Sequence, residues 1–464
     1  MIADSVGVGK TIEAELILKE YEARKDIDSI AIICPKPLIS EKKWENELKR
    51  FGEEFIPLNG SDLKYCLEET NSSGEWPRRF RKCIIPYSLF DEELLTGKKK
   101  GTRIARQGLL TLDPAPHFDL LIVDEAHHIK NTSTSRYKVV DFFSQHSDAA
   151  IFLTATPIEL GSRDLFVLLN SLRPDVFVDF STFQKMAEPN QFINNAAGVI
   201  RRKEDNWQLK ALEFLSSAKN TFWGKESFED NPDFIEVEEK LKESEVNEEE
   251  RVRLITTIEG FNTFSNIINR TRRRDIGNFT IRKSQTVRTT FSQSQENFYN
   301  HLLDIERKVM QICHGPNVEF MMNMIQRQCS SCIFGMIPLL KQILSRNISA
   351  ILEAYCEADE QTINEIITSV KEFFIELQQE AESLTPDDNK FEALLKTIKD
   401  KQTMENNKII IFSTFRHTLA YLLKKLQSEG LRVDVIHGDV PDEDRRALRK
   451  RFEMPKEDKN ERIQ

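Results

Sequence analysis

Residues 3–11, Ala-Asp-Ser-Val-Gly-Val-Gly-Lys-Thr, constrain this chain more than any other segment, because they run directly into an amphipathic helical pattern. Glycines in such a loop let the backbone approach phosphates, and the N–H groups at the start of the helix point at them. Lys10 is expected to reach the β- and γ-phosphates, and the Thr11 hydroxyl to hold Mg²⁺. Asp4 stands where the general loop has its first glycine. The segment predicts an ATP site with contacts from Asp4, Gly7, Val8, Gly9, Lys10 and Thr11.

Composition limits the partners that this protein can have. Its 464 residues carry a formal net charge of −10, so any nucleic-acid site has to be a local basic groove in an acidic protein. Apolar runs stay well short of the ~20 residues that span a bilayer, and no membrane partner is expected. Seven scattered cysteines favour a reducing compartment over a disulfide framework. We therefore expect a cytoplasmic protein, nucleoid-associated in a bacterium or nuclear in a eukaryote.

Short apolar runs alternate with helical patterns from residue 10 to about residue 185. The strand candidates are residues 29–35, 55–58, 83–85, 120–123 and 150–153. This alternation predicts an α/β fold with a doubly wound parallel sheet, whose ligands lie at the carboxyl ends of the strands. Three polar segments fall at such ends: the Lys10 loop, Asp124-Glu125 and Thr154-Ala155-Thr156. Their convergence on one edge predicts a nucleotide site there.

Asp124 and Glu125 suit phosphoryl transfer to water, a reaction that depends mostly on positioning and charge neutralisation. Asp124 directly follows an apolar strand and is placed to hold Mg²⁺ through water. Glu125 comes one residue later and can orient and deprotonate the attacking water. An isolated Asp-Glu pair is more simply a solvated turn. The preceding phosphate loop and the following Ala126-His127 favour the catalytic interpretation.

Several segments together resemble one family. Residues 124–131, Asp-Glu-Ala-His-His-Ile-Lys-Asn, resemble the DEAH-type Walker B box of superfamily 2 helicases, and the Lys-Asn extension resembles the Swi/Snf DNA translocases. Residues 4–11 resemble the first motif of that family, with Ser5 in place of its usual Glu. Residues 33–38 and 153–157 resemble its motifs Ia and III, and residues 86–88 resemble the motif that follows Ia. Bacterial RNA-polymerase-recycling ATPases look like the nearest branch.

The resemblance implies tandem RecA-like lobes that use ATP and Mg²⁺ to move along double-stranded DNA, with RNA as the alternative substrate. It also implies RNA polymerase or another protein complex as a partner. The residues that couple the ATP state to the nucleic acid would be His127, Thr154, Ala155 and Thr156. Nucleic-acid contacts would come from Pro35, Lys36, Tyr87, Ser88, Arg272, Arg273, Ser413, His437 and Gly438.

Some of these residues also have simpler interpretations. Lys36 could equally be a solvated loop residue. Arg272 and Arg273 could join the lobes by salt bridges instead of lining a groove. Trp44 recurs at helical spacing with Leu48 and Phe51, which indicates a core position.

We expect four segments along the chain. Residues 1–185 form a nucleotide-binding RecA-like lobe whose N-terminal strand is missing, and residues 186–285 form a helical, acidic insertion and a basic connector. Residues 286–400 form a helical protrusion leading to the second lobe, and residues 401–464 form the truncated start of that lobe. Residues 286–291, 408–414 and 433–438 are further strand candidates. Cys329 and Cys332 have metal-like spacing, but core cysteines on a helix are favoured because a zinc site needs four ligands.

No segment resembles motif VI, whose arginines reach the nucleotide from the second lobe. We therefore expect an incomplete protein that binds ATP and hydrolyses it poorly. Two alternatives stay open. The first is a strand-separating DNA or RNA helicase. The second is an inactive nucleotide-binding fragment or scaffold, which Ser5 favours and the intact Lys10, Asp124 and Glu125 oppose.

Overall fold

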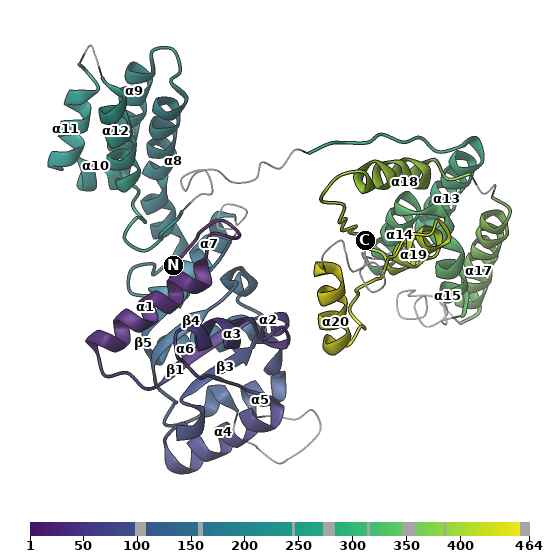
Figure 1. Ribbon diagram of the computed structural model, residues 1–464, viewed down its shortest axis with the longest axis horizontal. Helices are drawn as coiled ribbons and strands as arrows, with labels where there is room; N and C mark the ends of the chain where they lie inside the picture. Colours follow the sequence, from purple (N-terminus) through teal and green to yellow (C-terminus); the bar gives the residue numbers. More distant parts are fainter. Residues whose placement is uncertain are drawn as a thin grey trace. The chain divides into compact units, whose positions relative to one another are not determined.

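The computed structural model describes residues 1–97, 108–155, 161–243, 246–271, 284–312, 316–345, 360–384 and 387–454. The chain divides into two compact units, Met1–Ile281 and Arg282–Gln464 (Figure 1). Each unit is described by itself below. Among the described residues, no helix combines the length and the apolar character needed to cross a membrane.

The first unit is built on a parallel sheet. Its strands are β1 (Ile30–Cys34), β2 (Ile56–Pro57), β3 (Lys82–Pro86), β4 (Phe118–Val123) and β5 (Ser147–Phe152). They pair in the order β2-β3-β1-β4-β5, and every pairing is parallel. The apolar runs of β1, β3 and β4 form strands that are buried from both sides, whereas β2 and β5 at the edges are partly exposed. Ile2 makes a parallel bridge to Leu153, just beyond β5, and another to Asn269.

Helices cover both faces of this sheet (Figure 1). Ile30 and Ile32 of β1 join one core with Leu18 of α1 (Lys10–Arg24) and Trp44 of α3 (Lys43–Arg50). The alternate strand residues face a second core, to which α4 (Gly60–Ser73) and α6 (Ser135–Gln145) contribute Leu63, Leu67, Val139 and Phe143. The prediction of an α/β fold with a doubly wound parallel sheet is confirmed.

Shorter elements complete the sheet layer. They are α2 (Lys36–Ser40), α5 (Glu92–Thr96) and the 3₁₀ turns η1 (Arg78–Phe80), η2 (Tyr87–Leu89), η3 (Leu109–Thr111) and η4 (Ala126–Ile129). Two of them matter for function, because α2 directly follows β1 and η4 directly follows the Asp124-Glu125 pair.

A helical layer follows the sheet in the chain. It comprises α7 (Ser162–Leu172), α8 (Phe180–Arg202), α9 (Trp207–Lys219), α10 (Phe222–Phe228), α11 (Pro232–Lys240) and α12 (Glu248–Gly260). Helices α8 to α12 enclose their own apolar core. The acidic segment 228–250 contributes to it, since Phe228 and Phe234 are buried and stack with ring centroids 4.9 Å apart. The acidic side chains of this segment lie mostly on the exposed sides of these amphipathic helices.

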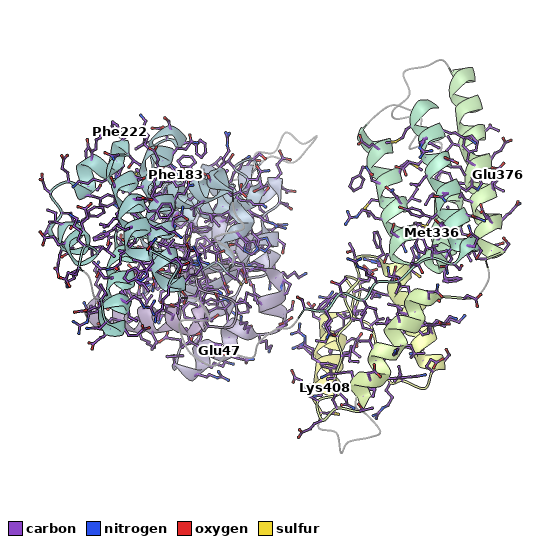
Figure 2. The ribbon with its side chains drawn as sticks, turned by 90° about the horizontal axis from the view of Figure 1, so that it is seen from above. Glu47, Phe183, Phe222, Met336, Glu376 and Lys408 are labelled. Atoms are coloured by element: carbon purple, nitrogen blue, oxygen red, sulfur yellow. The ribbon has the colours of Figure 1, made fainter. Side chains whose placement is uncertain are left out.

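The second unit contains a helical body and a smaller helical group. The body consists of α13 (Gln293–Ile312), α14 (Pro316–Ser331), η6 (Ile333–Gly335), α15 (Met336–Ser345) and α17 (Glu360–Glu382). Met336 is buried in its core, whereas Glu376 is exposed on α17 (Figure 2). The smaller group consists of α18 (Asn389–Gln402), α19 (Arg416–Ser428) and α20 (Asp442–Glu453).

The strands expected at 286–291, 408–414 and 433–438 do not form, and this corrects the sequence interpretation. All three segments are described, and none pairs in a sheet. Ile410 is 64% exposed and Phe412 is 89% exposed, so the second segment is not a buried strand. Apolar alternation favours a strand, but a strand is stable only when neighbouring strands accept its backbone hydrogen bonds.

Cys329 and Cys332 are core residues, as favoured from their helical context. Cys329 lies on α14 and Cys332 follows it directly, and both are buried. In the part of the chain that the structure describes, no cluster of three or more His, Cys, Asp or Glu side chains could hold a metal. Cys313 and His314 lie outside the described residues.

Candidate nucleotide site

The phosphate loop begins at the edge of the sheet where the carboxyl ends of the strands lie. Ile2 N–H donates to the carbonyl of Phe152 (2.8 Å), and Thr154 N–H donates to the carbonyl of Ile2 (3.0 Å). These bonds hold the first residues alongside the carboxyl end of β5. Asp4 to Thr11 therefore begin next to Thr154, as the convergence of polar motifs predicts.

Two glycines give the loop its shape. Gly7 has φ of 81° and Gly9 has φ of 107°, a left-handed region that side-chain-bearing residues rarely adopt. Gly9 is the N-cap of α1, and no side chain caps this end of the helix. The N–H groups of the first turn, which includes Lys10 and Thr11, are thus oriented for an anion in the way that helix N-termini favour.

Lys10 folds over its own loop. Its Nζ donates to the carbonyl oxygens of Asp4 (3.1 Å) and Ser5 (3.5 Å). The ammonium group is therefore held close to the loop that is expected to bind the phosphates. Thr11 is half-buried in the first turn of α1, and Val8 closes a turn by donating to the carbonyl of Ser5.

Asp4 joins the phosphate loop to the segment around Thr271. Its carboxylate is buried and accepts a hydrogen bond from the backbone N–H of Thr271. Ser5 N–H donates in turn to the carbonyl of Thr271 (3.1 Å), and Ala3 N–H donates to that of Asn269 (2.7 Å). The side chain of Asp4 therefore fastens the loop to Thr271, and its contact with ATP stays a prediction.

Asp124 is a buried carboxylate with defined donors on both oxygens. It is 4% exposed; Glu125 N–H donates to Oδ1 (2.8 Å) and the Trp44 indole Nε1–H donates to Oδ2 (3.0 Å). Burial and the neighbouring Glu125 raise the pKa of Asp124 above its usual value, and the bond from Trp44 opposes that rise. Carboxylate and hydroxyl oxygens are ligands that Mg²⁺ accepts, so Asp124 and Thr11 fit the expected metal.

Glu125 is held in an unusual backbone conformation. Its φ is 52°, in the left-handed region that costs a non-glycine residue free energy and that is often found at active sites. Its side chain is about one-third exposed, and Oε2 lies 3.3 Å from Nδ1 of His127. The carboxylate is thus accessible to water while its backbone is fixed by the end of β4 and the start of η4.

Backbone hydrogen bonds connect the segment around Thr154 to the residues that flank Asp124 and Glu125. Leu153 N–H donates to the carbonyl of Val123, and Ala126 N–H donates to the carbonyl of Leu153, each at 2.8 Å. Thr154 is fully buried one residue later, and Ala155 follows it. These bonds join the segment before Thr154 to the backbone on both sides of Asp124 and Glu125. Thr156 lies outside the described residues.

The histidines of η4 pack against one another. The rings of His127 and His128 lie 4.5 Å apart between centroids, and the Tyr87 ring lies 5.7 Å from that of His128. Burial lowers the pKa of His128, and His127 and Arg136 lower it further. His128 is therefore favoured in its neutral form beside the nucleotide site.

The residues expected to contact nucleic acid in this unit meet at the strand ends. Cys34 of β1 pairs in register with Pro86 of β3, so the residues that follow them, Pro35 with Lys36 and Tyr87 with Ser88, leave the sheet side by side. Lys36 and Ser88 are exposed there. Pro35 is the N-cap of α2.

Tyr87 differs from Lys36 and Ser88 because its side chain is buried, and its contact with nucleic acid stays a prediction. Its ring is buried in the sheet core, and its hydroxyl donates to the backbone carbonyl of Asp124 (2.9 Å). The Tyr87 side chain therefore supports the backbone at Asp124 and is almost fully shielded from solvent.

The remaining expected contacts are Arg272, Arg273, Ser413, His437 and Gly438. Arg272 and Arg273 fall outside the described residues. In the second unit, the Arg445 guanidinium donates to the carbonyls of His437 and Gly438, both at 2.9 Å, and shapes the turn before α20. Ser413 is half-buried and its hydroxyl accepts from Phe415 N–H (3.2 Å).

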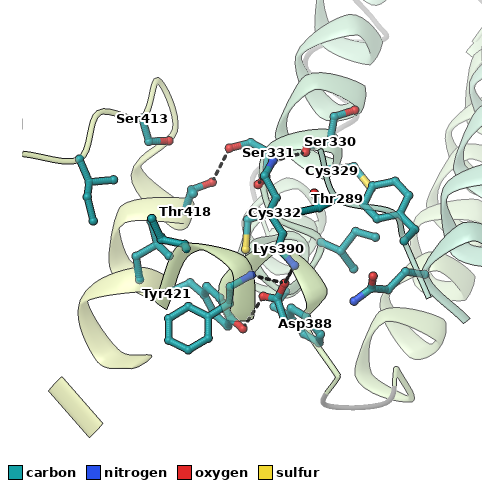
Figure 3. Close-up of a pocket in the computed structure, with 18 of the residues that line it drawn as sticks. Thr289, Cys329, Ser330, Ser331, Cys332, Asp388, Lys390, Ser413, Thr418 and Tyr421 are labelled. Atoms are coloured by element: carbon teal, nitrogen blue, oxygen red, sulfur yellow. Dashed lines mark hydrogen bonds between the residues drawn. The ribbon is translucent and has the colours of Figure 1, made fainter. Parts of the chain in front are cut away.

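A cavity of about 460 Å³ in the second unit has no assigned chemistry (Figure 3). Its polar lining groups pair with one another: Lys390 Nζ donates to the carbonyls of Ser330 (2.9 Å) and Ser331 (3.0 Å), and the Tyr421 hydroxyl donates to Asp388 (2.8 Å). These bonds join α14, α18 and α19, as in an ordinary packing interface.

Sequence reasoning missed two contacts to the predicted site residue Asp124. Trp44 and Tyr87 both bond to Asp124, one to its side chain and one to its backbone. The helical spacing of Trp44 correctly indicated burial, but spacing carries no information on where an indole N–H points.

Comparison with known proteins identifies the family. The family model described as SNF2-related domain matches residues 1–347, and the Helicase conserved C-terminal domain matches residues 389–462. An uncharacterized ATP-dependent helicase of Bacillus subtilis, YqhH, is 26% identical over 434 residues, which cover 93% of this chain and 57% of the relative. The RNA polymerase-associated protein RapA of Pasteurella multocida is 30% identical over 206 residues, which cover 42% of this chain and 19% of RapA.

Among solved structures, the SWI2/SNF2 ATPase core of Sulfolobus solfataricus in complex with dsDNA matches with a TM-score of 0.32 and 15% identity, covering 97% of this chain and 70% of that one. That TM-score supports no conclusion on how the parts of this chain are arranged. The chain spans less than two thirds of the length of YqhH and of RapA. Because the SNF2-related model covers well over half of the sequence, and the motifs that suggested it lie at one sheet edge, this chain belongs to the SNF2-related family.

Proposed function

We propose that this chain is the ATP-hydrolysing motor of a double-stranded DNA translocase. The observation that carries the proposal is the junction of three motifs at one sheet edge. Ile2, which leads into the phosphate loop, is hydrogen-bonded to Thr154, and Leu153 is hydrogen-bonded to Val123 and Ala126, which flank Asp124 and Glu125. Nucleotide binding at the loop can therefore alter both the catalytic pair and motif III.

Each residue of the site has a role in the proposed reaction. The N-terminal turn of α1 and Lys10 bind the phosphates, and Thr11 and Asp124 hold Mg²⁺. The metal, when bound, neutralises charge on the phosphate oxygens. Glu125 accepts a proton from water as the water oxygen bonds to the γ-phosphorus and the bond from that phosphorus to the β-phosphate oxygen breaks.

Coupling to nucleic acid would use the same sheet edge. Lys36 and Ser88 are exposed at the ends of β1 and β3, where they can contact backbone phosphates. Such contacts carry no sequence information, so binding is expected to be largely sequence-independent and strongly salt-sensitive. His127, whose Nδ1 lies 3.3 Å from Oε2 of Glu125, and Ala155 would transmit the state of the nucleotide to this edge.

The partner is proposed on the relatives alone. RapA is named as associated with RNA polymerase, which supports a role for the whole protein at a polymerase or a similar complex. A bacterial protein of this kind would act in the cytoplasm, at the nucleoid.

The test measures the binding of a fluorescent ATP analogue with Mg²⁺, and ATP hydrolysis alone and with duplex DNA, single-stranded DNA or RNA. Lys10→Ala should weaken nucleotide binding, and Lys25→Ala, at the other end of the same helix, should not. Glu125→Gln should keep binding and abolish turnover, with the exposed Glu68→Gln as its control.

Each outcome discriminates. Unchanged nucleotide affinity in Lys10→Ala would remove the phosphate-loop assignment, and full turnover in Glu125→Gln would remove Glu125 as the base. Stimulation by duplex DNA without unwinding of a forked duplex would support a translocase, whereas unwinding would support a helicase. Binding of ATP with no turnover under any condition would support the scaffold alternative.

A further inference from the structure

We propose that Trp44 is a positioning residue for Asp124, which holds the metal-binding carboxylate in one orientation through its indole N–H. The proposal rests on the proposed function, because it assigns Asp124 to Mg²⁺. Trp44 is fully buried on α3, and its Nε1 lies 3.0 Å from Oδ2 of Asp124.

The two oxygens of Asp124 are constrained in different ways. Oδ1 accepts from the N–H of the next residue, Glu125, a bond that follows from the local backbone. Oδ2 accepts from Trp44, which lies 80 residues earlier in the chain. The first bond leaves the carboxylate free to tilt about its short side chain; the second adds a fixed point on another element. Together they determine which lone pairs face the metal.

A purely structural role would not need an indole at this position. The ring of Trp44 packs in an apolar core with Ala14, Leu18 and Ile32, and a phenylalanine could supply most of that contact. The feature specific to tryptophan is a buried N–H, which requires an acceptor. Here the acceptor is the carboxylate assigned to the metal, and partners of this kind, which orient a ligand, typically change metal affinity about 10–100-fold when removed.

Helix α3 links this contact to the rest of the site. Its apolar face packs against α1, which begins at the phosphate loop, and it follows α2, which begins at Lys36. Lys42, between α2 and α3, has φ of 54°, so the connection turns sharply and sets the direction in which α3 starts. Trp44 therefore makes the orientation of Asp124 depend on a helix that also contacts the helix of the phosphate loop.

The experiment compares Trp44→Phe with Trp76→Phe in the full chain. Trp76 is also buried in the first unit, and its Nε1 donates to the carbonyl of Phe80 (3.0 Å), so the control loses an equivalent bond remote from Asp124. Affinity for a fluorescent ATP analogue is measured as Mg²⁺ is titrated. Trp44→Phe should need about 10–100-fold more Mg²⁺ for the same affinity, with metal-free nucleotide binding unchanged. Trp76→Phe should match the wild type.

A second measurement uses the unsubstituted protein and does not depend on the folding of Trp44→Phe. The chain has four tryptophans, so the indole ¹H–¹⁵N signal of Trp44 is identified once Trp76, Trp207 and Trp223 have been assigned by substitution. This signal should shift when Mg²⁺ is added to nucleotide-saturated protein. A folded Trp44→Phe variant with wild-type Mg²⁺ dependence, or a Trp44 signal that does not move, overturns the proposal. Wild-type protein without any Mg²⁺-dependent nucleotide binding overturns the proposed function as well.

Discussion

Glu15 on α1 makes this protein less stable as pH rises toward neutrality. Its side chain is 1% exposed, and among the described residues neither carboxylate oxygen has a hydrogen-bond partner. Burial and, less strongly, the nearby Glu47 of α3 raise the pKa of Glu15, Arg50 opposes this rise, and the pKa moves from 4.5 to about 7. The folded protein therefore binds a proton here that the unfolded chain releases, and the free energy of unfolding falls as pH rises from about 4.5 to about 7.

The magnitude follows from the two pKa values. At about 1.36 kcal/mol for each tenfold change in proton affinity, the ionised carboxylate costs about 3 kcal/mol once pH exceeds the folded pKa. Because solvent relaxation around the carboxylate reduces this cost, we expect about 2 kcal/mol between pH 5 and pH 8.

Glu15→Met tests this expectation, because methionine is unbranched, of similar length and apolar. At pH 8 the free energy of unfolding of the variant should exceed that of the wild type by about 2 kcal/mol. Most of this difference should disappear at pH 5. Glu20→Met, on the exposed side of the same helix, removes a carboxylate that pairs with Arg24 and should change stability by less than about 0.5 kcal/mol at either pH.

The assay is urea denaturation of the full chain, followed by tryptophan fluorescence at pH 5, 6, 7 and 8. Trp44 packs in the same apolar core as α1, so fluorescence reports the unfolding of this region. Parallel pH profiles for the wild type and Glu15→Met would refute the reasoning, because they would mean that Glu15 keeps the same proton affinity in both states.

Two further substitutions test the nucleic-acid edge and the sheet core. Lys36→Ala should weaken duplex DNA binding uniformly across sequences and reduce its salt dependence by about one phosphate contact. Lys64→Ala, at an exposed position on α4, should change neither. Equal salt slopes for Lys36→Ala and the wild type in gel-shift titrations would remove Lys36 from the interface. Phe143→Ala should lower the free energy of unfolding by about 3–5 kcal/mol, because its ring is fully buried against Phe118; the same change at the exposed Phe222 (Figure 2) should cost less than about 1 kcal/mol, and equal losses would contradict the assigned core.

Local patterns in this sequence were sufficient to predict the sheet of the first unit. Apolar runs at 30–34, 83–85 and 120–123 become buried parallel strands, and helices cover both faces. The same reasoning placed the phosphate loop and Asp124 at one edge. It succeeds because strand length, burial and the residue after a strand are all set by neighbours in the chain.

The same reasoning was wrong at 408–414, where an equally apolar run remains unpaired. Pairing is a property of two segments, so the pattern of one segment cannot establish it.

What the sequence by itself determined is the family, the parallel sheet and the identity of the nucleotide-site motifs. What only the tertiary structure decided is which side chains those motifs contact. Asp4 bonds to Thr271, 267 residues away, and Asp124 bonds to Trp44, 80 residues away. Side-chain periodicity depends on covalent spacing and is legible in the sequence. The direction of a hydrogen bond between distant residues depends on how the whole sheet and its helices pack, and only the folded chain brings its donor and acceptor together.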